Sequence, residues 1–342
     1  MIRSKTLSLR ARVRQVFSTV AMIAVVAVGA ASASAAEKVK LVFAASGADK
    51  GALKEVTLYL VNRMKELTNS RVEIERFMGG ALGGEVQLNE LLIAGEVDII
   101  MAGVFADSNY PEYSIGSIPF LLPSWEEKKA FYDNPVWRKK VAAKLKKDKL
   151  VLLEPITMGQ QFITSNRALR EPADMKRLKF RVAQDKAQIT VYRTLGALIT
   201  PMSSKQIFSA LQTGVVDGQV NTLSNNFGRQ LWEVQKYLIR GKHILWPWNL
   251  ATSEKTLGKL SKADRKALIQ TAREMRDVAA KAIEKQEAPL IKAMTKKHGM
   301  QYIEWDAAVL KKWQAAARKG IEEVFATKDP EIVAIVKKMA DF

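Results

Sequence analysis

Residues 211–221 read LQTGVVDGQVN and join a helix to a strand without a loop. An apolar helical pattern ends at Gly214, a residue type that commonly follows the last turn of a helix. A buried-strand pattern then runs to the polar amide of Asn221. A similar stretch, LIAGEVD, occurs at residues 92–98. Two copies of this junction predict an α/β chain with two similar halves.

Both halves show the same predicted element order, β-α-β-α-β. In the first half, strands and helices are expected over 39–45, 53–67, 71–77, 85–95 and 96–103. In the second half, they are expected over 178–183, 185–196, 197–202, 203–214 and 215–221. The last helix begins with a capping box formed by Ser203 and Gln206. Two ordinary α/β turns can have similar sequences by chance, but the shared order of five elements favours two similar lobes.

Two long extended stretches, 149–166 and 237–253, connect these halves and indicate a hinge with a ligand cleft beside it. A long helical segment follows from Ser261 to Gly299, and Pro289 is expected to kink or split it. These elements predict two similar α/β lobes joined by crossing strands and a long helix. Lobe I is expected over 37–158 plus 247–286, and lobe II, with the C-terminal helices, over 159–246 plus 287–342.

The first 36 residues are predicted to be a signal peptide. Five basic residues precede the apolar run VFSTVAMIAVVAVGA, and ASASAA then offers the small residues that signal peptidase accepts. The apolar run is short for a membrane span, so an uncleaved anchor is the weaker alternative. No cysteine follows it, which excludes lipid attachment there. We expect cleavage near Ala35 or Ala36 and export to a Gram-negative periplasm.

The composition narrows the possible functions. The chain of 342 residues carries a formal charge of +19 and has no cysteine, which excludes disulfides and Zn–Cys sites. The basic residues are scattered along helices without interleaved aromatic residues, so we expect no nucleic-acid partner. The histidines, His243 and His298, are far apart in sequence and are expected to be structural. No cofactor or metal site is predicted.

Two residues at strand ends are the first candidates for a binding site. Ligands of open α/β sheets lie outside the carboxyl ends of the strands, where Asn221 and Arg181 are expected. A guanidinium group matches a carboxylate with a planar pair of donors, and an amide supplies donors and an acceptor. An ordinary role for Asn221 as a turn residue at the strand end carries similar weight.

Several stretches resemble the solute-binding proteins of tripartite ATP-independent periplasmic (TRAP) transporters. They are GGALGGEVQLNELLIAGEVD (79–98), YPEYSIGSIPFLLPSWEE (110–127), TSNRALREPADMKRLKFRV (164–182) and LGALITPMSSKQIFSALQTGVVDGQVNTLSN (195–225). The resemblance extends over nearly the whole chain after the leader. It implies a periplasmic-binding-protein-like fold, in which two α/β lobes close around an organic anion. It also implies delivery of that anion to TRAP permease subunits. It also implies that Arg181 holds the ligand carboxylate and that Asn221 lines the site.

The departures from the family pattern bear on the ligand. Gln161 stands where members that bind acidic sugars or dicarboxylates often have a second arginine. Ser203 and Ser204 replace the aromatic residue that often follows TPM. Gly103, Val104, Ala44 and Ala45 leave the first half apolar at its strand ends. Trp246 and Trp248 lie near the second crossing, where they either face the ligand or pack in the core.

We therefore predict a monomeric receptor for an organic acid, most simply a monocarboxylate, which performs no chemistry. The predicted ligand contacts are Arg181, Asn221, Gln161, Trp246 and Ser204. An exported enzyme that acts on a carboxylate is the first alternative. It is opposed by the absence of cysteine and of a histidine–carboxylate pattern, and Asp217 is expected to be a structural residue within its strand. The second alternative is a sensor subunit that presents the ligand to a receptor kinase.

Overall fold

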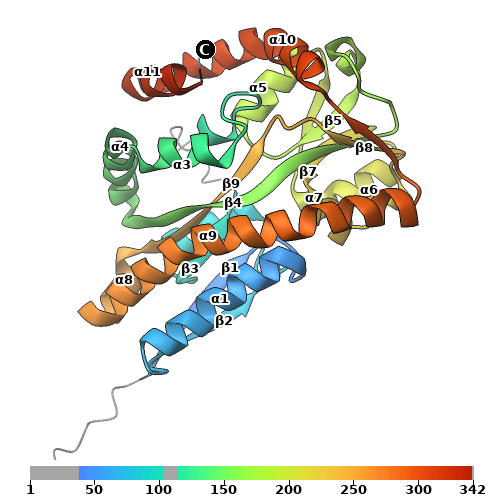
Figure 1. Ribbon diagram of the computed structural model, residues 1–342. Helices are drawn as coiled ribbons and strands as arrows, with labels where there is room; N and C mark the ends of the chain where they lie inside the picture. The colour runs from blue at the N-terminus through green and yellow to red at the C-terminus, as the bar shows by residue number, and fades with distance from the viewer. Residues whose placement is uncertain (1–37, 104–114, 341–342) are drawn as a thin grey trace, which may run out of the picture. The chain divides into compact units, whose positions relative to one another are not determined.

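The computed structural model describes residues 38–103 and 115–340 (Figure 1). The first unit of the fold (residues 39–102) has the predicted β-α-β-α-β order. Its elements are β1 (Val39–Ala45), α1 (Gly51–Leu67), β2 (Val72–Phe77), α2 (Glu85–Ala94) and β3 (Ile99–Ala102). Helix α2 ends because Gly95 adopts the left-handed conformation, with φ of 73°. The signal-peptide prediction and Val104 lie outside the described residues.

The second unit (residues 179–222) repeats this order. Its elements are β5 (Lys179–Val182), α5 (Lys186–Thr194), β6 (Leu198–Pro201), the 3₁₀ turn η4 (Ser204–Gln206), α6 (Ile207–Gln212) and β7 (Gly218–Thr222). The capping box of Ser203 and Gln206 is present. The prediction that Asp217 lies within the strand is wrong. It precedes β7, and its carboxylate lies 3.6 Å from Lys179 Nζ.

Two long strands connect the units. Strand β4 (Leu150–Ser165) pairs with β9 (Leu245–Ser253) along its first part and with β7 along its last part. The strand order is β2-β1-β3-β9-β4-β7-β5-β6, with β8 (Tyr237–Arg240) on β4 and β10 (Gln301–Glu304) on β8. The β4–β9 pairing is irregular between Thr157 and Gln160. Gly159 lies inside this irregularity with φ of 88°, a conformation that favours glycine.

Helix α9 (Lys262–Lys292) packs against both α1 and β4 (Figure 1). Glu274 on α9 accepts hydrogen bonds from Tyr59 and Arg63 on α1. Pro289 lies inside α9 and does not split it, contrary to one of the two predicted outcomes. The helix continues into a π-helical turn, Ala293–Lys297, and the chain then turns at Gly299 as expected. A single proline near a helix end removes only one backbone hydrogen bond, which accounts for the continuity.

The remaining helices surround these strands. They are α3 (Trp125–Asp133), α4 (Pro135–Leu145), α7 (Leu223–Gly228), α8 (Glu254–Lys259), α10 (Ala307–Phe325) and α11 (Pro330–Met339), with 3₁₀ turns at Lys146–Asp148, Pro172–Met175 and Leu231–Glu233. Helix α10 packs on α5, and α11 contacts α3. One large hydrophobic core includes residues of both units, from Leu41 on β1 to Phe180 on β5. The predicted lobe boundaries remain a prediction.

Candidate functional site

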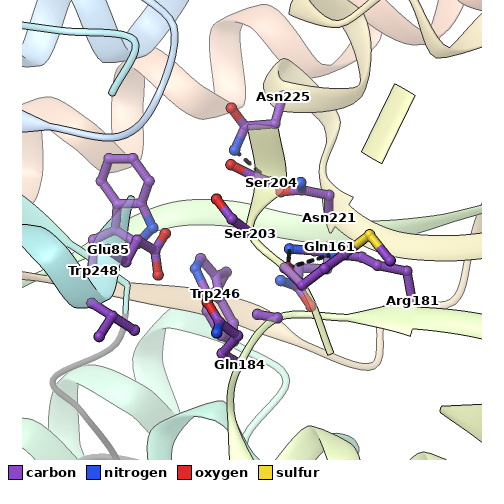
Figure 2. Close-up of a pocket in the computed structure, with 13 residues that line it drawn as sticks. Glu85, Gln161, Arg181, Gln184, Ser203, Ser204, Asn221, Asn225, Trp246 and Trp248 are labelled. Atoms are coloured by element: carbon purple, nitrogen blue, oxygen red, sulfur yellow. Dashed lines mark hydrogen bonds between the residues drawn. The ribbon is translucent and has the colours of Figure 1, made fainter. Parts of the chain in front are cut away.

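A pocket between the two units contains all five residues predicted to contact a ligand (Figure 2). It is lined by Glu85, Val86, Gln161, Arg181, Ala183, Gln184, Met202, Ser203, Ser204, Asn221, Asn225, Trp246 and Trp248. Eight of the thirteen lie at or just after the carboxyl ends of β5, β6 and β7, as expected for this class of sheet. The cavity of about 30 Å³ has room for about two water molecules.

Backbone carbonyl groups fix the position of Arg181. Its Nε and Nη2 donate to Met202 O at 3.1 and 2.7 Å, and its Nη1 donates to Val220 O at 3.1 Å. A guanidinium group has five N–H donors, so one donor on each terminal nitrogen remains for a ligand. The side chain is only 3% exposed. These carbonyls therefore draw the guanidinium group into the wall of the second unit.

The charge of Arg181 has no acidic partner within ion-pair distance among the described residues. Burial lowers the pKa of Arg181 to about 9, while the more distant carboxylate of Glu85 acts in the opposite direction. Because arginine stays protonated in proteins, the lowered pKa expresses the free-energy cost of a buried and uncompensated charge. A ligand carboxylate on the two remaining N–H groups would reduce that cost.

Asn221 combines the two roles considered for it. Its Oδ1 accepts hydrogen bonds from Thr222 N at 2.8 Å and from Asn225 Nδ2 at 3.1 Å, which ties the end of β7 to the first turn of α7. With its oxygen used in this way, the amide nitrogen of Asn221 remains as a donor at the pocket. Asn225 conversely keeps its own oxygen as an acceptor, a contribution that the sequence analysis missed.

Gln161 and the two tryptophans come from the connecting strands β4 and β9. Gln188 Nε2 donates to Gln161 Oε1 at 3.1 Å, so the amide nitrogen of Gln161 is left as a donor. Trp246 and Trp248 are both buried and both line the pocket, so packing and pocket roles coexist. Among the described residues, the buried indole nitrogen of Trp248 has no hydrogen-bond partner, which identifies a donor available to a bound molecule.

Gly103 makes room for the two indoles. A Cβ atom at this position would lie 2.6 Å from Trp246 Nε1 and 2.8 Å from Trp248 Nε1, closer than real Cβ contacts allow. The expectation of an apolar strand end in the first unit is thus correct at Gly103, Ala44 and Ala45, of which the two alanines are fully buried.

Glu85 brings a polar group to the pocket from the first unit, at a helix start and not at a strand end. It occupies the first turn of α2 and lines the pocket, and Ser46 Oγ donates to its Oε1 at 3.3 Å. Figure 2 shows Glu85 and Trp248 on one side of the pocket and Arg181 on the other. Acidic residues in the first turn of a helix ordinarily interact with its dipole, so this glutamate gave no functional signal in the sequence.

The two serines after β6 have different partners. Ser203 Oγ belongs to the capping box, where it faces Lys205 N at 3.5 Å. Ser204 Oγ instead accepts a hydrogen bond from Arg229 Nη2 at 3.0 Å. Arg229 is the residue directly after α7 and is separated from Ser204 by 25 positions in sequence, so no local pattern could reveal the contact.

The two units are also in direct contact beside the pocket residue Ser204. Lys205 Nζ, on the second unit, donates a hydrogen bond to Gly80 O in the loop before α2. Elsewhere, Ser117 Oγ donates to Asp185 Oδ2 at 2.6 Å, where Asp185 caps α5. These contacts and the small cavity describe a cleft that has closed.

A second cavity, of about 510 Å³, lies on the other face of the connecting strands. Adjacent residues of a strand point to opposite faces. Gln160 and Leu245 accordingly line the second cavity, while their neighbours Gln161 and Trp246 line the pocket. Helix α9 closes the second cavity with Ile283, Glu284 and other residues.

Both histidines have structural environments outside the pocket. His243 Nε2 lies 2.7 Å from the Tyr192 hydroxyl, and burial lowers the pKa of His243 to about 3, so the ring is neutral. His298 stacks on Trp232 with ring centroids 4.0 Å apart.

Among residues 38–103 and 115–340, no cluster of three or more histidine or acidic side chains could hold a metal ion. No helix in the same residues is sufficiently long and apolar to cross a membrane.

Comparison with known proteins gives consistent matches. The family model described as "Bacterial extracellular solute-binding protein, family 7" matches residues 43–328. A solute-binding protein of Roseobacter denitrificans is 28% identical over 282 residues, covering 81% of this chain and 83% of the relative. The sialic acid-binding periplasmic protein SiaP of Vibrio cholerae is 27% identical over 233 residues, covering 68% and 73%.

Solved structures match at the level of the fold. The sugar acid-binding protein DctPAm of Advenella mimigardefordensis, in complex with galactonate, gives a TM-score of 0.83 at 26% identity and covers 89% of this chain and 98% of its own. A TRAP periplasmic solute-binding protein of Bordetella, with density assigned to pantoate, gives 0.81 at 26% identity and covers 88% and 99%. The predicted α/β fold of the periplasmic-binding-protein type is confirmed.

Proposed function

The chain belongs to family 7 of the bacterial extracellular solute-binding proteins, as its resemblance to TRAP solute-binding proteins predicted, and we propose that it captures an organic monocarboxylate and delivers it to TRAP permease subunits. Arg181 carries this proposal. It is a buried guanidinium in the pocket wall, with no acid within ion-pair distance among the described residues and with one N–H left on each terminal nitrogen. Two parallel N–H donors of this kind suit a carboxylate.

The charges around the pocket favour one carboxylate over two. Arg181 and Glu85 line the pocket, and Arg229 lies directly behind Ser204. Counted over the described side chains, these two guanidinium groups and one carboxylate sum to a single positive charge, which one ligand carboxylate would balance. Gln161, in place of the second arginine, can bind a neutral oxygen but cannot neutralise another charge. The galactonate and pantoate of the related structures are both monocarboxylates.

The remaining polar groups indicate a ligand body that bears hydroxyl groups. Asn221, Gln161 and Trp248 present N–H donors, while Glu85 and Asn225 present acceptor oxygens. A hydroxyl group can donate and accept at once and so suits a wall of mixed polarity. The faces of the two tryptophans would pack against the carbon chain or ring of such an acid.

Entry of the ligand requires the cleft to open. A cavity of about 30 Å³ is far smaller than a sugar acid needs, and the Lys205–Gly80 contact joins the two units. We propose a hinge in β4 and β9, with lobe I over 37–158 plus 247–286 and lobe II over 159–246 plus 287–342. Scattering at saturating ligand should then show a smaller radius of gyration than the ligand-free protein.

The receptor is proposed to act in the periplasm as a soluble monomer after cleavage near Ala35 or Ala36. Mass spectrometry of the periplasmic fraction tests the cleavage, and an intact N-terminus would contradict it. We propose binding without catalysis, because the described lining holds one carboxylate and no histidine to serve as an acid–base pair.

Thermal-shift screening followed by calorimetry tests the ligand class. The panel should contain galactonate, gulonate, erythronate and pantoate, the dicarboxylate galactarate, and the neutral alditol galactitol. Tight binding of at least one monocarboxylate, with no binding of galactitol, is expected. Preference for galactarate bound as a dianion would contradict the charge argument, and no response to any acid would contradict the proposed function.

A further inference from the structure

Arg229 stands next to the pocket without lining it. Its Nη2 donates a hydrogen bond to Ser204 Oγ at 3.0 Å, and Ser204 does line the pocket. Its Nε is buried and has no hydrogen-bond partner. Within residues 38–103 and 115–340, no carboxylate lies within ion-pair distance of this guanidinium group. A partly buried cation whose best contact is a serine hydroxyl requires a physical explanation.

The contact determines what Ser204 can offer to a bound molecule. A serine hydroxyl has one hydrogen to donate and lone pairs that accept. Because Arg229 donates to the oxygen, the Ser204 hydrogen is directed away from Arg229. Among the described residues, no acceptor for this hydrogen is recorded. Ser204 is therefore held as a donor toward the pocket.

Arg229 also lies close enough to Arg181 to affect it. The charge of Arg229 is among the causes that lower the pKa of Arg181, and burial lowers the pKa of Arg229 itself. Two like charges near each other in a buried region are unfavourable unless an anion joins them. The local arrangement is therefore suited to electron-rich oxygens placed between Arg181 and Ser204.

We propose that Arg229 is a positioning residue that holds Ser204 as a hydrogen-bond donor to an oxygen at the acid end of the ligand. That oxygen belongs to the carboxylate itself or to the hydroxyl group on the neighbouring carbon, so the preferred substrates are 2-hydroxy acids over acids without this hydroxyl. The inference rests on the proposed function and assigns a role to a residue outside the pocket lining.

A double-mutant cycle with galactonate, gulonate and pantoate as probes tests this role by calorimetry. Ser204→Ala and Arg229→Met should each weaken binding by about tenfold, since each removes a donor to a charged or strongly polar group. The double variant should be about as weak as either single variant. Arg229→Gln, which keeps an N–H donor but no charge, should retain more affinity than Arg229→Met. Arg265→Met removes an exposed guanidinium group that donates to Leu260 O and should bind normally.

The outcomes separate this inference from the proposed function. Wild-type affinity in Arg229→Met would overturn the inference alone. Full additivity in the double variant would also overturn it, because Arg229 would then act by its charge and not through Ser204. A wild-type protein that binds none of the acids would overturn the proposed function and this inference together. Thermal unfolding of each variant shows whether the variant still folds. Arg229→Gln is the conservative variant that keeps the test valid if Arg229→Met does not fold.

Discussion

The two β-α-β-α-β units share an element order but place different chemistry at the pocket. The second unit contributes Arg181, Ser204 and Asn221, each held by hydrogen bonds within its own wall. The first unit contributes Glu85 and Val86 from the start of α2. The wall of the second unit thus carries a buried guanidinium group, and the wall of the first unit carries a carboxylate. Similar folds thus divide the work of binding through a few residues at strand ends and helix starts.

The largest effect on ligand affinity should come from Arg181, in the wall that the second unit contributes. Arg181→Ala should weaken binding of the tightest acid at least roughly 30-fold, because loss of one member of a buried ion pair costs about 2–5 kcal/mol. Arg181→Lys should recover part of the affinity, since it keeps the charge without the planar pair of donors.

Arg181→Ala should also lower the free energy of unfolding by about 1–3 kcal/mol, because Met202 O and Val220 O lose their donor. Calorimetry and urea unfolding measure the two effects, with Arg265→Ala as the exposed control. Unchanged affinity in the folded variant would place the ligand carboxylate elsewhere. The two walls of the pocket would then not differ in how they treat an anion.

The wall that the first unit contributes should control, through Glu85, how many charges the preferred ligand carries. Glu85→Gln adds one net positive charge around the pocket, so the affinity for galactarate relative to galactonate should rise about tenfold. Glu90→Gln is the matched control, since Glu90 is exposed on the same helix and is not part of the pocket lining. Competition calorimetry gives the ratio. A ratio equal to that of the wild type would show that Glu85 does not sense ligand charge.

A smaller effect is expected at the contact between the walls. Lys205→Met removes the hydrogen bond to Gly80 O and should weaken binding about threefold, mainly through faster dissociation. Stopped-flow displacement measures the dissociation rate, and Lys266→Met on the exposed face of α9 serves as the control. An unchanged dissociation rate would mean that closure does not depend on this contact.

The smallest effect on ligand affinity is expected at Lys128 of α3, a buried cation that is not part of the pocket lining. Its Nζ donates to Gly116 O, and burial lowers the pKa of Lys128 to about 7. The unfolded chain, with a lysine pKa near 10.4, binds more protons between these values. This group therefore raises stability as pH increases from about 7, by up to about 1.4 kcal/mol per pH unit.

Lys128→Met should abolish that pH dependence and leave galactonate binding unchanged. Urea unfolding at pH 6, 7, 8 and 9 measures the slope, and calorimetry measures binding. A wild-type protein with a flat stability profile over this range would show that the buried amine does not titrate there.

The sequence predicted the elements well where local physics decides them. Gly95 and Gly214 marked helix ends, and the box of Ser203 and Gln206 marked a helix start. It also predicted that Arg181, Asn221, Gln161, Trp246 and Ser204 would meet, because strand ends and a family pattern indicated them. What escaped prediction depends on contacts between distant segments.

Glu85 and Arg229 are the clearest examples of such residues. Glu85 appears in the sequence as an ordinary first-turn acid, and only the approach of the second unit makes it part of a pocket. Arg229 follows a short helix and reaches Ser204 across the fold. Burial of Arg181 was likewise invisible, since it follows from the carbonyl groups of Met202 and Val220.

The alternation of side chains along β4 and β9 offers a practical route to an optical reporter. Because Gln160 and Leu245 face the second cavity while Gln161 and Trp246 face the pocket, a probe on the far side can follow the same strands without touching the ligand. The natural sequence contains no cysteine, so Glu284→Cys would accept one thiol-reactive fluorophore at a defined position. A change in its emission on ligand binding would then report occupancy of the pocket from the opposite face of the connecting strands.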